Sequence, residues 1–271
     1  MVTVSTPTSK TRTFELYDGL SVTVEKRGAR SASAVLMLHG GAGPRSMAGF
    51  AAAMSEHAYV ITPTHPGFDG TPRPDWADSI ADLAEVYLGL VEKLGLRHVL
   101  VVGSSFGGWI AAEMALRDTR GRVSGLIMLA GVGIAPEPPL EIADPAKLGP
   151  VRTGELAFHN PALRPNPAAF TEEQRAVGAA NLRTAGVYTG VMYDPKLRGR
   201  LHRITVPVLV LAGEQDGIVP LQYQHALAGS FPRATFRSIP QAGHFPHVEQ
   251  PASVFAAIGE FVSTEIKPDG E

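Results

Sequence analysis

The stretch VLVVGSSFGGWIAAEMAL, residues 99–116, decides how this chain folds. An apolar run typical of a buried strand ends in two serines, and a helical pattern follows them at once. The second serine, Ser105, is the centre of a G-x-S-x-G pattern over residues 103–107. A serine whose hydroxyl projects above a sheet needs a sharp, strained turn, and glycines two positions before and after it keep the strand and the helix from clashing. Ser104 stands one position too early for this glycine pair, so the stretch predicts Ser105 as a nucleophile between a strand and a helix.

Strand-like runs alternate with helical patterns along most of the chain. Residues 14–28 alternate around an Asp-Gly pair and predict a β-hairpin, and the apolar spacing of residues 79–96 predicts a helix. Further strand-like runs are SAVLMLHG, AYVITP, VSGLIMLAG, VPVLVLAG and RATFRSIP. Strands buried on both faces that alternate with helices predict an α/β fold with a doubly wound, mostly parallel sheet. Sites in such sheets lie at the carboxyl ends of the strands.

The pattern changes at residues 133–203, which are rich in proline and short of apolar runs. The segment keeps too many apolar residues for a disordered tether, and residues 171–185 have a helical pattern. We therefore expect a mostly helical insertion at 133–203, set into a core formed by residues 1–132 and 204–271.

The composition excludes several classes of partner. With a net charge of −2 and scattered basic residues, the 271-residue chain has no electrostatic footprint for nucleic acid or for an anionic membrane. The absence of cysteine excludes disulfides, a thiol nucleophile and Cys-ligated metals. The N-terminal stretch lacks the apolar segment of a signal peptide, and no run approaches the roughly 18 apolar residues that span a bilayer. We therefore expect a cytoplasmic protein, with no prediction of its oligomeric state.

A serine nucleophile needs a base, and histidine is the usual one because its unperturbed pKa of about 6.5 lets it take and return a proton. His244 lies in the loop after the last predicted strand, where a base is expected. His247 is its local rival, but the H-x-x-H pair has no third ligand at a suitable spacing, so we expect no metal. His225 falls within a helical pattern, and His39 lies beside glycines at a strand end, which favours a surface role for the first and a structural role for the second.

The base in turn needs a carboxylate that holds its tautomer and orientation. The segment AGEQDGIVP, residues 212–220, follows a predicted strand and offers Glu214 and Asp216. Asp216 lies at the apex of the loop and is the candidate acid. Glu214 is closer to the strand end, where a structural role is the alternative.

The glycine-rich segment LMLHGGAGP, residues 36–44, predicts a site for an oxyanion. Gly41 is the first choice for one N–H donor, with Ala42 as the alternative, and Phe106, directly after the nucleophile, is the second donor. Each such donor contributes roughly 3–4 kcal/mol to transition-state stabilisation. A phosphate-binding loop is disfavoured because the segment has neither a GK[ST] ending nor G-x-G-x-x-G spacing.

Taken together, these motifs resemble those of the α/β-hydrolase fold superfamily over about residues 20–265. They are LHGGAGP, THPGFDGTPRP, GSSFGG, AGEQDGIVP and GHFPHVEQP, in the expected order. The resemblance implies an α/β-hydrolase fold with an inserted helical cap, in which Ser105 is the nucleophile, Asp216 the acid and His244 the base. It also places His65 in the loop that shapes the mouth of the site, where many members have an acidic or neutral residue.

The pocket residues that we expect are His65, Phe158, Tyr188 and Phe245. Phe158 and Tyr188 belong to the predicted cap, which would close over the serine. Other cap residues that could line the acyl pocket are Leu156, Phe170, Met192 and Tyr193. For every cap residue the alternative is that it only forms the core of the cap.

The resemblance implies a serine esterase of class EC 3.1.1 that cleaves a small carboxylic ester or lactone without a cofactor. One alternative is a C–C bond hydrolase of ring-fission diketones, although such relatives typically place a tryptophan where this chain has Phe245. No cation stands out as a carboxylate clamp, for which Arg152, Arg164 and Arg183 are the candidates. The other alternative is a non-catalytic member of the fold that binds a small molecule. A nucleotide-binding oxidoreductase has only GVGIAP in its favour, and that segment lacks the final glycine.

Overall fold

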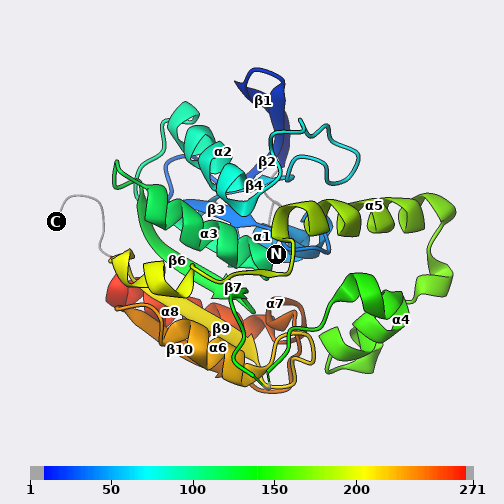
Figure 1. Cartoon of the computed structure of the whole chain (residues 1–271). Coiled ribbons are helices and arrows are strands. Elements are labelled where there is room, and N and C mark those ends of the chain that lie inside the picture. The colour runs from blue at the N-terminus through cyan, green and yellow to red at the C-terminus, as the bar shows by residue number, and fades with distance from the viewer. Residues whose placement is uncertain (1–8, 139, 267–271) are drawn as a thin grey trace, which may run out of the picture.

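An eight-stranded sheet runs through the molecule in the order β1-β2-β4-β3-β5-β6-β9-β10 (Figure 1). The computed structural model describes residues 9–138 and 140–266, so residues 1–8 of the N-terminal stretch, in which we expect no signal peptide, lie outside it. The strands of this sheet are β1 (Lys10–Tyr17), β2 (Leu20–Arg27), β3 (Ala34–Leu38), β4 (Tyr59–Pro63), β5 (Val99–Ser104), β6 (Val123–Leu129), β9 (Val208–Gly213) and β10 (Ala234–Ile239). Strands that pair in parallel are β4, β3, β5, β6, β9 and β10, in this order across the sheet. At one edge β1 and β2 form the predicted antiparallel hairpin, and β2 pairs with β4, also antiparallel. The predicted doubly wound, mostly parallel sheet is confirmed.

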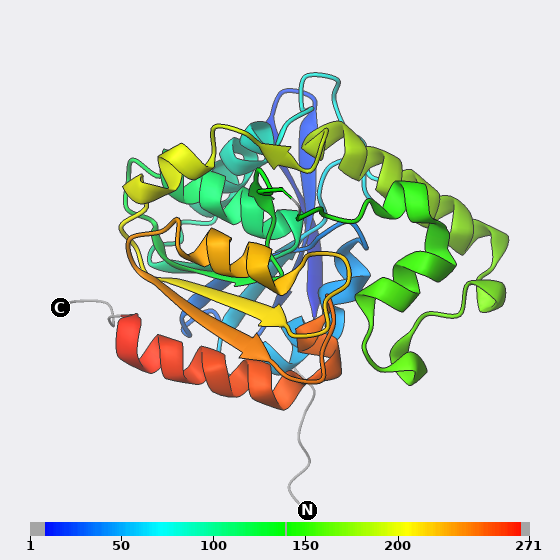
Figure 2. The same cartoon turned by 60° about the horizontal axis from the view of Figure 1, so that its bottom comes forward.

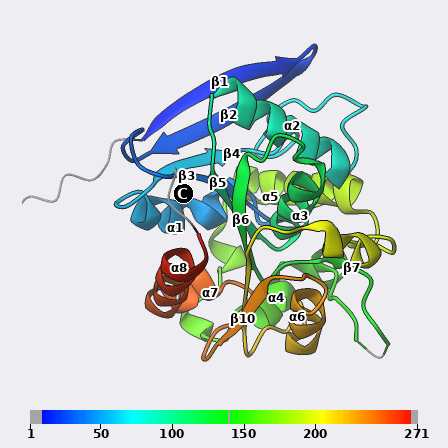
Figure 3. The same cartoon turned by 90° about the vertical axis from the view of Figure 1, so that its left-hand side faces the viewer.

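Helices cover both faces of the sheet, as Figure 3 shows. One face carries α1 (Ala48–Met54) and α8 (Pro251–Glu265), and the other carries α2 (Ile80–Lys93), α3 (Phe106–Arg117) and α6 (Leu221–Ala228). The side chains of β3 alternate between the two cores: Leu36 and Leu38 pack with α2 and α3, whereas Val35 and Met37 pack with α1 and α8. This division explains the continuous apolar runs, because each parallel strand is buried on both sides.

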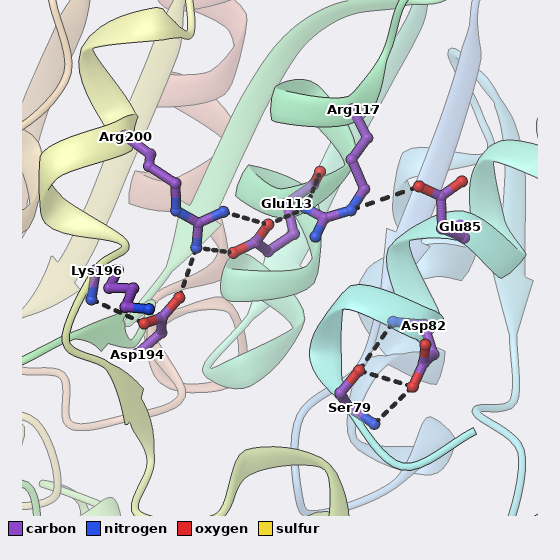
Figure 4. Close-up of polar contacts among 8 residues, drawn as sticks. All are labelled: Ser79, Asp82, Glu85, Glu113, Arg117, Asp194, Lys196 and Arg200. Carbon is purple, nitrogen blue, oxygen red and sulfur yellow. Dashed lines mark hydrogen bonds and ion pairs between the residues drawn. The ribbon is translucent and has the colours of Figure 1, made fainter. Parts of the chain in front are cut away.

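Helix α2 begins where the sequence pattern indicates. Ser79 is its N-cap, and the hydroxyl of Ser79 accepts a hydrogen bond from the N–H of Asp82 while the Asp82 carboxylate accepts from the N–H of Ser79 (Figure 4). Such a capping box satisfies N–H groups at the helix start that have no partner within the helix.

Between β6 and β9 the chain leaves the sheet and forms two helices, α4 (Pro145–Ala157) and α5 (Glu172–Thr189). Figure 2 shows both helices, in green and yellow-green, beyond the arrowheads of the strands. The shorter elements of the molecule are β7 (Gly133–Ile134), β8 (Tyr193–Asp194), η1 (Pro44–Met47), η2 (Pro161–Leu163), η3 (Pro167–Ala169), η4 (Arg198–Arg203) and α7 (Pro246–Glu249). The two short strands β7 and β8, at the start and the end of this segment, pair in parallel. The sequence pattern does not indicate this pairing. In the described part of the chain no helix is long and apolar enough to cross a bilayer.

A network of charged side chains joins β8 and η4 to α3, as Figure 4 shows. Glu113 of α3 is buried, and its carboxylate accepts hydrogen bonds from Arg117 and, at 2.8 Å, from Arg200 of η4. Arg200 also pairs with Asp194 of β8, with 2.5 Å between Nη2 and Oδ2. The buried carboxylate therefore has two cationic partners, which a buried charge requires.

Candidate active site

The residues predicted for the site follow different strands but share the carboxyl edge of the sheet. Gly41 follows β3, Ser105 follows β5, Asp216 follows β9 and His244 follows β10. Because these strands are parallel, the loops that follow them gather at one end of the sheet. The topology therefore brings all four to the place where the fold positions a site.

Ser105 occupies the strained turn predicted for it. Its φ of 54° and ψ of −121° lie in a region that L residues rarely adopt, and α3 begins at the next residue. A Cβ at Gly103 would lie 2.2 Å from the carbonyl oxygen of Gly107, and a Cβ at Gly107 would lie 2.4 Å from that of Leu38. The two glycines thus allow the strand and the helix to approach, for the reason that the sequence indicates.

Asp216 and His244 form a buried pair. Nδ1 of His244 lies 2.9 Å from Oδ2 of Asp216, and the side chain of Asp216 is fully buried. The second carboxylate oxygen, Oδ1, accepts hydrogen bonds from the N–H groups of Ile218 at 2.8 Å and Val219 at 2.9 Å. Because the carboxylate accepts from the imidazole, Nδ1 carries the proton and Nε2 is left as an acceptor.

The rival residues lie elsewhere. Glu214 is exposed and accepts a hydrogen bond from the hydroxyl of Ser238 at 2.9 Å. His247 contacts the carbonyl oxygen of Ser46 at 3.3 Å, and His225 is exposed on α6 against the ring of Phe236. Ser104 is the last residue of β5 and is buried. None of these contacts involves Asp216.

The loop after β3 packs directly against the nucleophile turn. A Cβ at Gly40 would lie 3.0 Å from Cβ of Ser105. Within the described residues, the N–H groups of Gly41 and Ala42 donate no hydrogen bond, and Phe106, as the first residue of α3, has no acceptor within its helix. These N–H groups are free to bind an oxyanion. Nor does Ser105 Oγ make a hydrogen bond to His244 in the described chain, a contact that often forms only with substrate bound.

His65, which we expect in the pocket, is fully buried in the structure. Its ring lies against His39, with 3.7 Å between the ring centroids. Its Nε2 donates to the carbonyl oxygen of His39 at 2.8 Å, and its Nδ1 accepts from the hydroxyl of Tyr87. The structural role predicted for His39 is confirmed, because Nδ1 of His39 donates to the carbonyl oxygen of Gly40 at 2.8 Å.

Phe158 and Phe245 meet beside the imidazole. Their rings stack with 5.0 Å between centroids, and the ring of Phe245 also lies edge-on to His244 at 5.3 Å. The end of α4 is held there by its backbone: the N–H of His244 donates to Ala157 O at 2.7 Å, and the N–H of Gly217 donates to Leu156 O at 2.9 Å. Both rings are partly exposed, so they form an apolar wall next to the predicted base.

One face of α5 is fixed to the loop after β4. The buried amide of Asn181 accepts from the N–H of Asp69 and donates to its carboxylate, each at 2.8 Å. The hydroxyl of Thr184 donates to Gly67 O at 3.1 Å, and that of Tyr188 donates to Pro66 O at 3.0 Å. Tyr188, expected in the pocket, is therefore buried in this contact, and burial raises the pKa of its hydroxyl. Asn181 was missed, because no short-range pattern marks a contact across 112 residues.

Two of the three candidate carboxylate clamps already have partners of their own. Arg152 pairs with Glu155 at 2.8 Å, and Arg164 donates to the carbonyl oxygen of Phe158 at 3.2 Å. Arg183 is exposed on α5. No group of three or more histidine or acidic side chains able to hold a metal occurs in the described part of the chain.

Comparison with known proteins shows the family and the fold. The Alpha/beta hydrolase family matches residues 35–258. The chain is 28% identical to 2-hydroxymuconate semialdehyde hydrolase of Pseudomonas putida over 83% of its length and 85% of the relative's. It is 25% identical to pimeloyl-[acyl-carrier protein] methyl ester esterase of Serratia marcescens, over 78% and 86% of the two chains. A solved structure, the 2-hydroxy-6-oxo-6-phenylhexa-2,4-dienoate hydrolase of Rhodococcus sp. strain RHA1, superposes with a TM-score of 0.77 at 21% identity, covering 96% of this chain and 100% of its own. The chain belongs to the alpha/beta hydrolase family.

Proposed function

We propose that the protein is a serine hydrolase that cleaves a small carboxylic ester or lactone through an acyl-enzyme on Ser105. The observation that carries the proposal is the placement of a strained serine and a buried imidazole–carboxylate pair at one edge of the sheet. A serine hydroxyl is a weak nucleophile until a base takes its proton. Structural stability does not require a non-glycine residue in a strained turn, so the strain supports a chemical role for Ser105.

The proposed reaction has two halves. Nε2 of His244 takes the proton of Ser105 Oγ, and the oxygen attacks the ester carbonyl. The N–H groups of Phe106 and Gly41, or Ala42 in its place, bind the oxyanion. His244 then gives the proton to the leaving alcohol; water, deprotonated by the same nitrogen, attacks the acyl-enzyme, and the acid leaves while the proton returns to Ser105. Asp216 holds the Nδ1–H of His244 throughout.

The segment 133–203 is proposed to act as the cap, with Phe158 and Phe245 as the apolar wall of the acyl pocket. The stacked pair lies beside His244 and is partly exposed, which supports an uncharged acyl or alkoxy group at that point. Tyr188 holds the cap helix and does not belong to this wall.

Cleavage of a C–C bond is the second candidate. Two C–C hydrolases resemble this chain: the 2-hydroxymuconate semialdehyde hydrolase in sequence and the 2-hydroxy-6-oxo-6-phenylhexa-2,4-dienoate hydrolase in fold. The dienoate named for one of them is a carboxylate, and such a substrate favours a cation in the pocket. Arg152 and Arg164 are already engaged by Glu155 and by the carbonyl oxygen of Phe158. The pairing of Arg152 with a carboxylate favours an uncharged ester, whereas Arg164, bonded to a neutral carbonyl, and the exposed Arg183 are the cations that a ring-fission carboxylate would need.

A substrate panel tests the proposal. Purified protein is assayed with esters of graded acyl length, lactones and vinylogous diketones, in parallel with Ser105→Ala. We expect ester or lactone turnover that Ser105→Ala abolishes. Turnover of diketones alone would favour the C–C hydrolase, and saturable binding without any turnover would favour the non-catalytic binding protein.

A further inference from the structure

Two hydrogen bonds join two buried histidines, His39 in the loop after β3 and His65 in the loop after β4. Nε2 of His65 lies 2.8 Å from the carbonyl oxygen of His39, and the backbone nitrogen of His65 lies 3.1 Å from Nε2 of His39. Both side chains are fully buried. The ring of Phe68 packs against His39 with 4.8 Å between centroids, and the ring of Phe106 packs against His65 with 5.5 Å.

Backbone partners fix the protons on three of the four ring nitrogens, and burial decides the fourth. The backbone N–H of His65 can only donate, so Nε2 of His39 accepts and Nδ1 of His39 carries the proton that is donated to Gly40 O. The carbonyl of His39 can only accept, so Nε2 of His65 carries a proton. Burial lowers the pKa of His65 well below its ordinary value and keeps the ring neutral, so Nδ1 of His65 is an acceptor and the hydroxyl of Tyr87 donates to it. Each ring is therefore neutral and has one tautomer.

Burial supports this assignment. Removal from water lowers the pKa of His39 to about 4 and lowers the pKa of His65 well below its ordinary value. Burial also raises the pKa of the Tyr87 hydroxyl, which keeps it a donor. The network therefore keeps the same protons at neutral pH.

The network ends on the peptide that carries the predicted oxyanion donor. The carbonyl of Gly40 and the N–H of Gly41 belong to one planar trans peptide and point in opposite directions. The carbonyl accepts from Nδ1 of His39 at 2.8 Å and from the N–H of Gly43 at 3.0 Å. Fixing this carbonyl therefore fixes the direction of the Gly41 N–H.

We propose that His65, acting through His39, is a positioning residue that orients the Gly40–Gly41 peptide for oxyanion binding, with the hydroxyl of Tyr87 holding the ring of His65 at Nδ1. This role rests on the proposed function, because it assigns the Gly41 N–H to the oxyanion. The role is inferred from two contacts of the His65 side chain, one with Tyr87 of α2 and one with His39 after β3. His65 touches neither substrate nor nucleophile in this account.

Kinetics of three variants test the proposal. His65→Leu removes the donor to the His39 carbonyl, whereas His65→Gln keeps an N–H near the Nε2 position. Misplacing one oxyanion donor costs on the order of 10- to 100-fold in rate. We expect His65→Leu to lower kcat by that factor with KM within twofold, and His65→Gln to recover most of it. Tyr87→Phe should lower kcat by a smaller factor than His65→Leu.

The matched control is Tyr223→Phe, because Tyr223 is as buried as Tyr87 and its hydroxyl donates to the Ile134 carbonyl at 2.8 Å. We expect it to lower the melting temperature without lowering kcat. A folded His65→Leu protein with unchanged kcat would overturn the proposal, and so would a rise in KM at constant kcat.

Nitrogen-15 NMR gives an arm that does not depend on turnover. At pH 7 we expect His39 as the Nδ1–H tautomer and His65 as the Nε2–H tautomer, and a shift of the Gly41 amide signal in His65→Leu but not in Tyr223→Phe. Other tautomers, or an unmoved Gly41 signal, would overturn the positioning role. Failure of the proposed function looks different: the wild-type protein would turn over no ester while these signals remain as expected.

Discussion

Asp216 uses both of its carboxylate oxygens, one for Nδ1 of His244 at 2.9 Å and the other for two backbone N–H groups of its own loop. The backbone bonds fix the carboxylate, and the carboxylate fixes the ring. Because the pair is buried, an orientation lost here would not be restored by water.

Replacing this carboxylate with an amide should therefore impair the reaction more than the fold. In Asp216→Asn the amide can donate to Nδ1, which favours the tautomer with the proton on Nε2. We expect kcat to fall on the order of 10³- to 10⁴-fold. Glu214→Gln, two residues away and exposed, is the control and should keep its kcat. Steady-state kinetics with an ester decide: equal losses in the two variants would contradict the assignment of the acid.

The nucleophile turn makes a prediction about stability. A Cβ in Gly103→Ala meets a backbone oxygen at 2.2 Å, which no side-chain movement relieves. We expect the free energy of unfolding to fall by at least about 3 kcal/mol, near the upper end of overpacking effects. Gly178→Ala, in α5 with open space around it, should instead gain roughly 0.5–1 kcal/mol. Urea unfolding measures both, and a tolerated alanine at 103 would argue against the tight turn.

Stability should fall as the pH drops from 7 to 5. Burial lowers the pKa values of His39 and His247 to about 4, against about 6.5 in the unfolded chain. The unfolded chain therefore binds more protons between pH 6.5 and 4, and protonation in this window favours unfolding. For each of these histidines, the free energy of unfolding should fall by about 2 kcal/mol between pH 7 and pH 5.

Urea unfolding at pH 7, 6 and 5 measures this loss. His247→Gln lies outside the oxyanion loop and removes one of the titrating groups, so its stability should change less with pH than that of the wild type. A variant whose stability falls as steeply as that of the wild type would show that His247 does not titrate as burial requires.

The contact between Asn181 and Asp69 holds α5 over the loop after β4. Asn181→Ala leaves the partly buried Asp69 N–H without its partner, and an unsatisfied group costs about 1–3 kcal/mol when fully buried, which is the upper bound here. We expect earlier proteolytic cleavage near α5 and a lower free energy of unfolding. Arg183→Ala, on the same helix but exposed, should change neither property. Arg183→Ala also tests the carboxylate clamp, since an unchanged KM would remove this arginine from it.

The sequence was informative where function depends on local geometry. The glycine spacing around Ser105 and the positions of Asp216 and His244 after strands follow from short motifs, and the structure places these residues at one edge. The two-faced strands and α2 follow from periodicity in the same way.

Contacts between distant segments were not predictable in this way. The motif locates His65 on the correct loop, but the direction of its ring depends on Tyr87, 22 residues later, and on His39, 26 residues earlier. The pairing of β7 with β8 involves two residues on each side, too few for a periodic signal. Likewise, the role of Tyr188 depends on a carbonyl 122 residues away.

Labelling with a fluorophosphonate tests the central claim most directly. The reagent bonds to an activated serine, and the tryptic peptide of residues 98–117 contains both Ser104 and Ser105. We expect one adduct per chain on this peptide, retained in Ser104→Ala and lost in Ser105→Ala. An adduct on another peptide, an adduct lost in Ser104→Ala alone, or a folded protein that stays unlabelled would contradict the account.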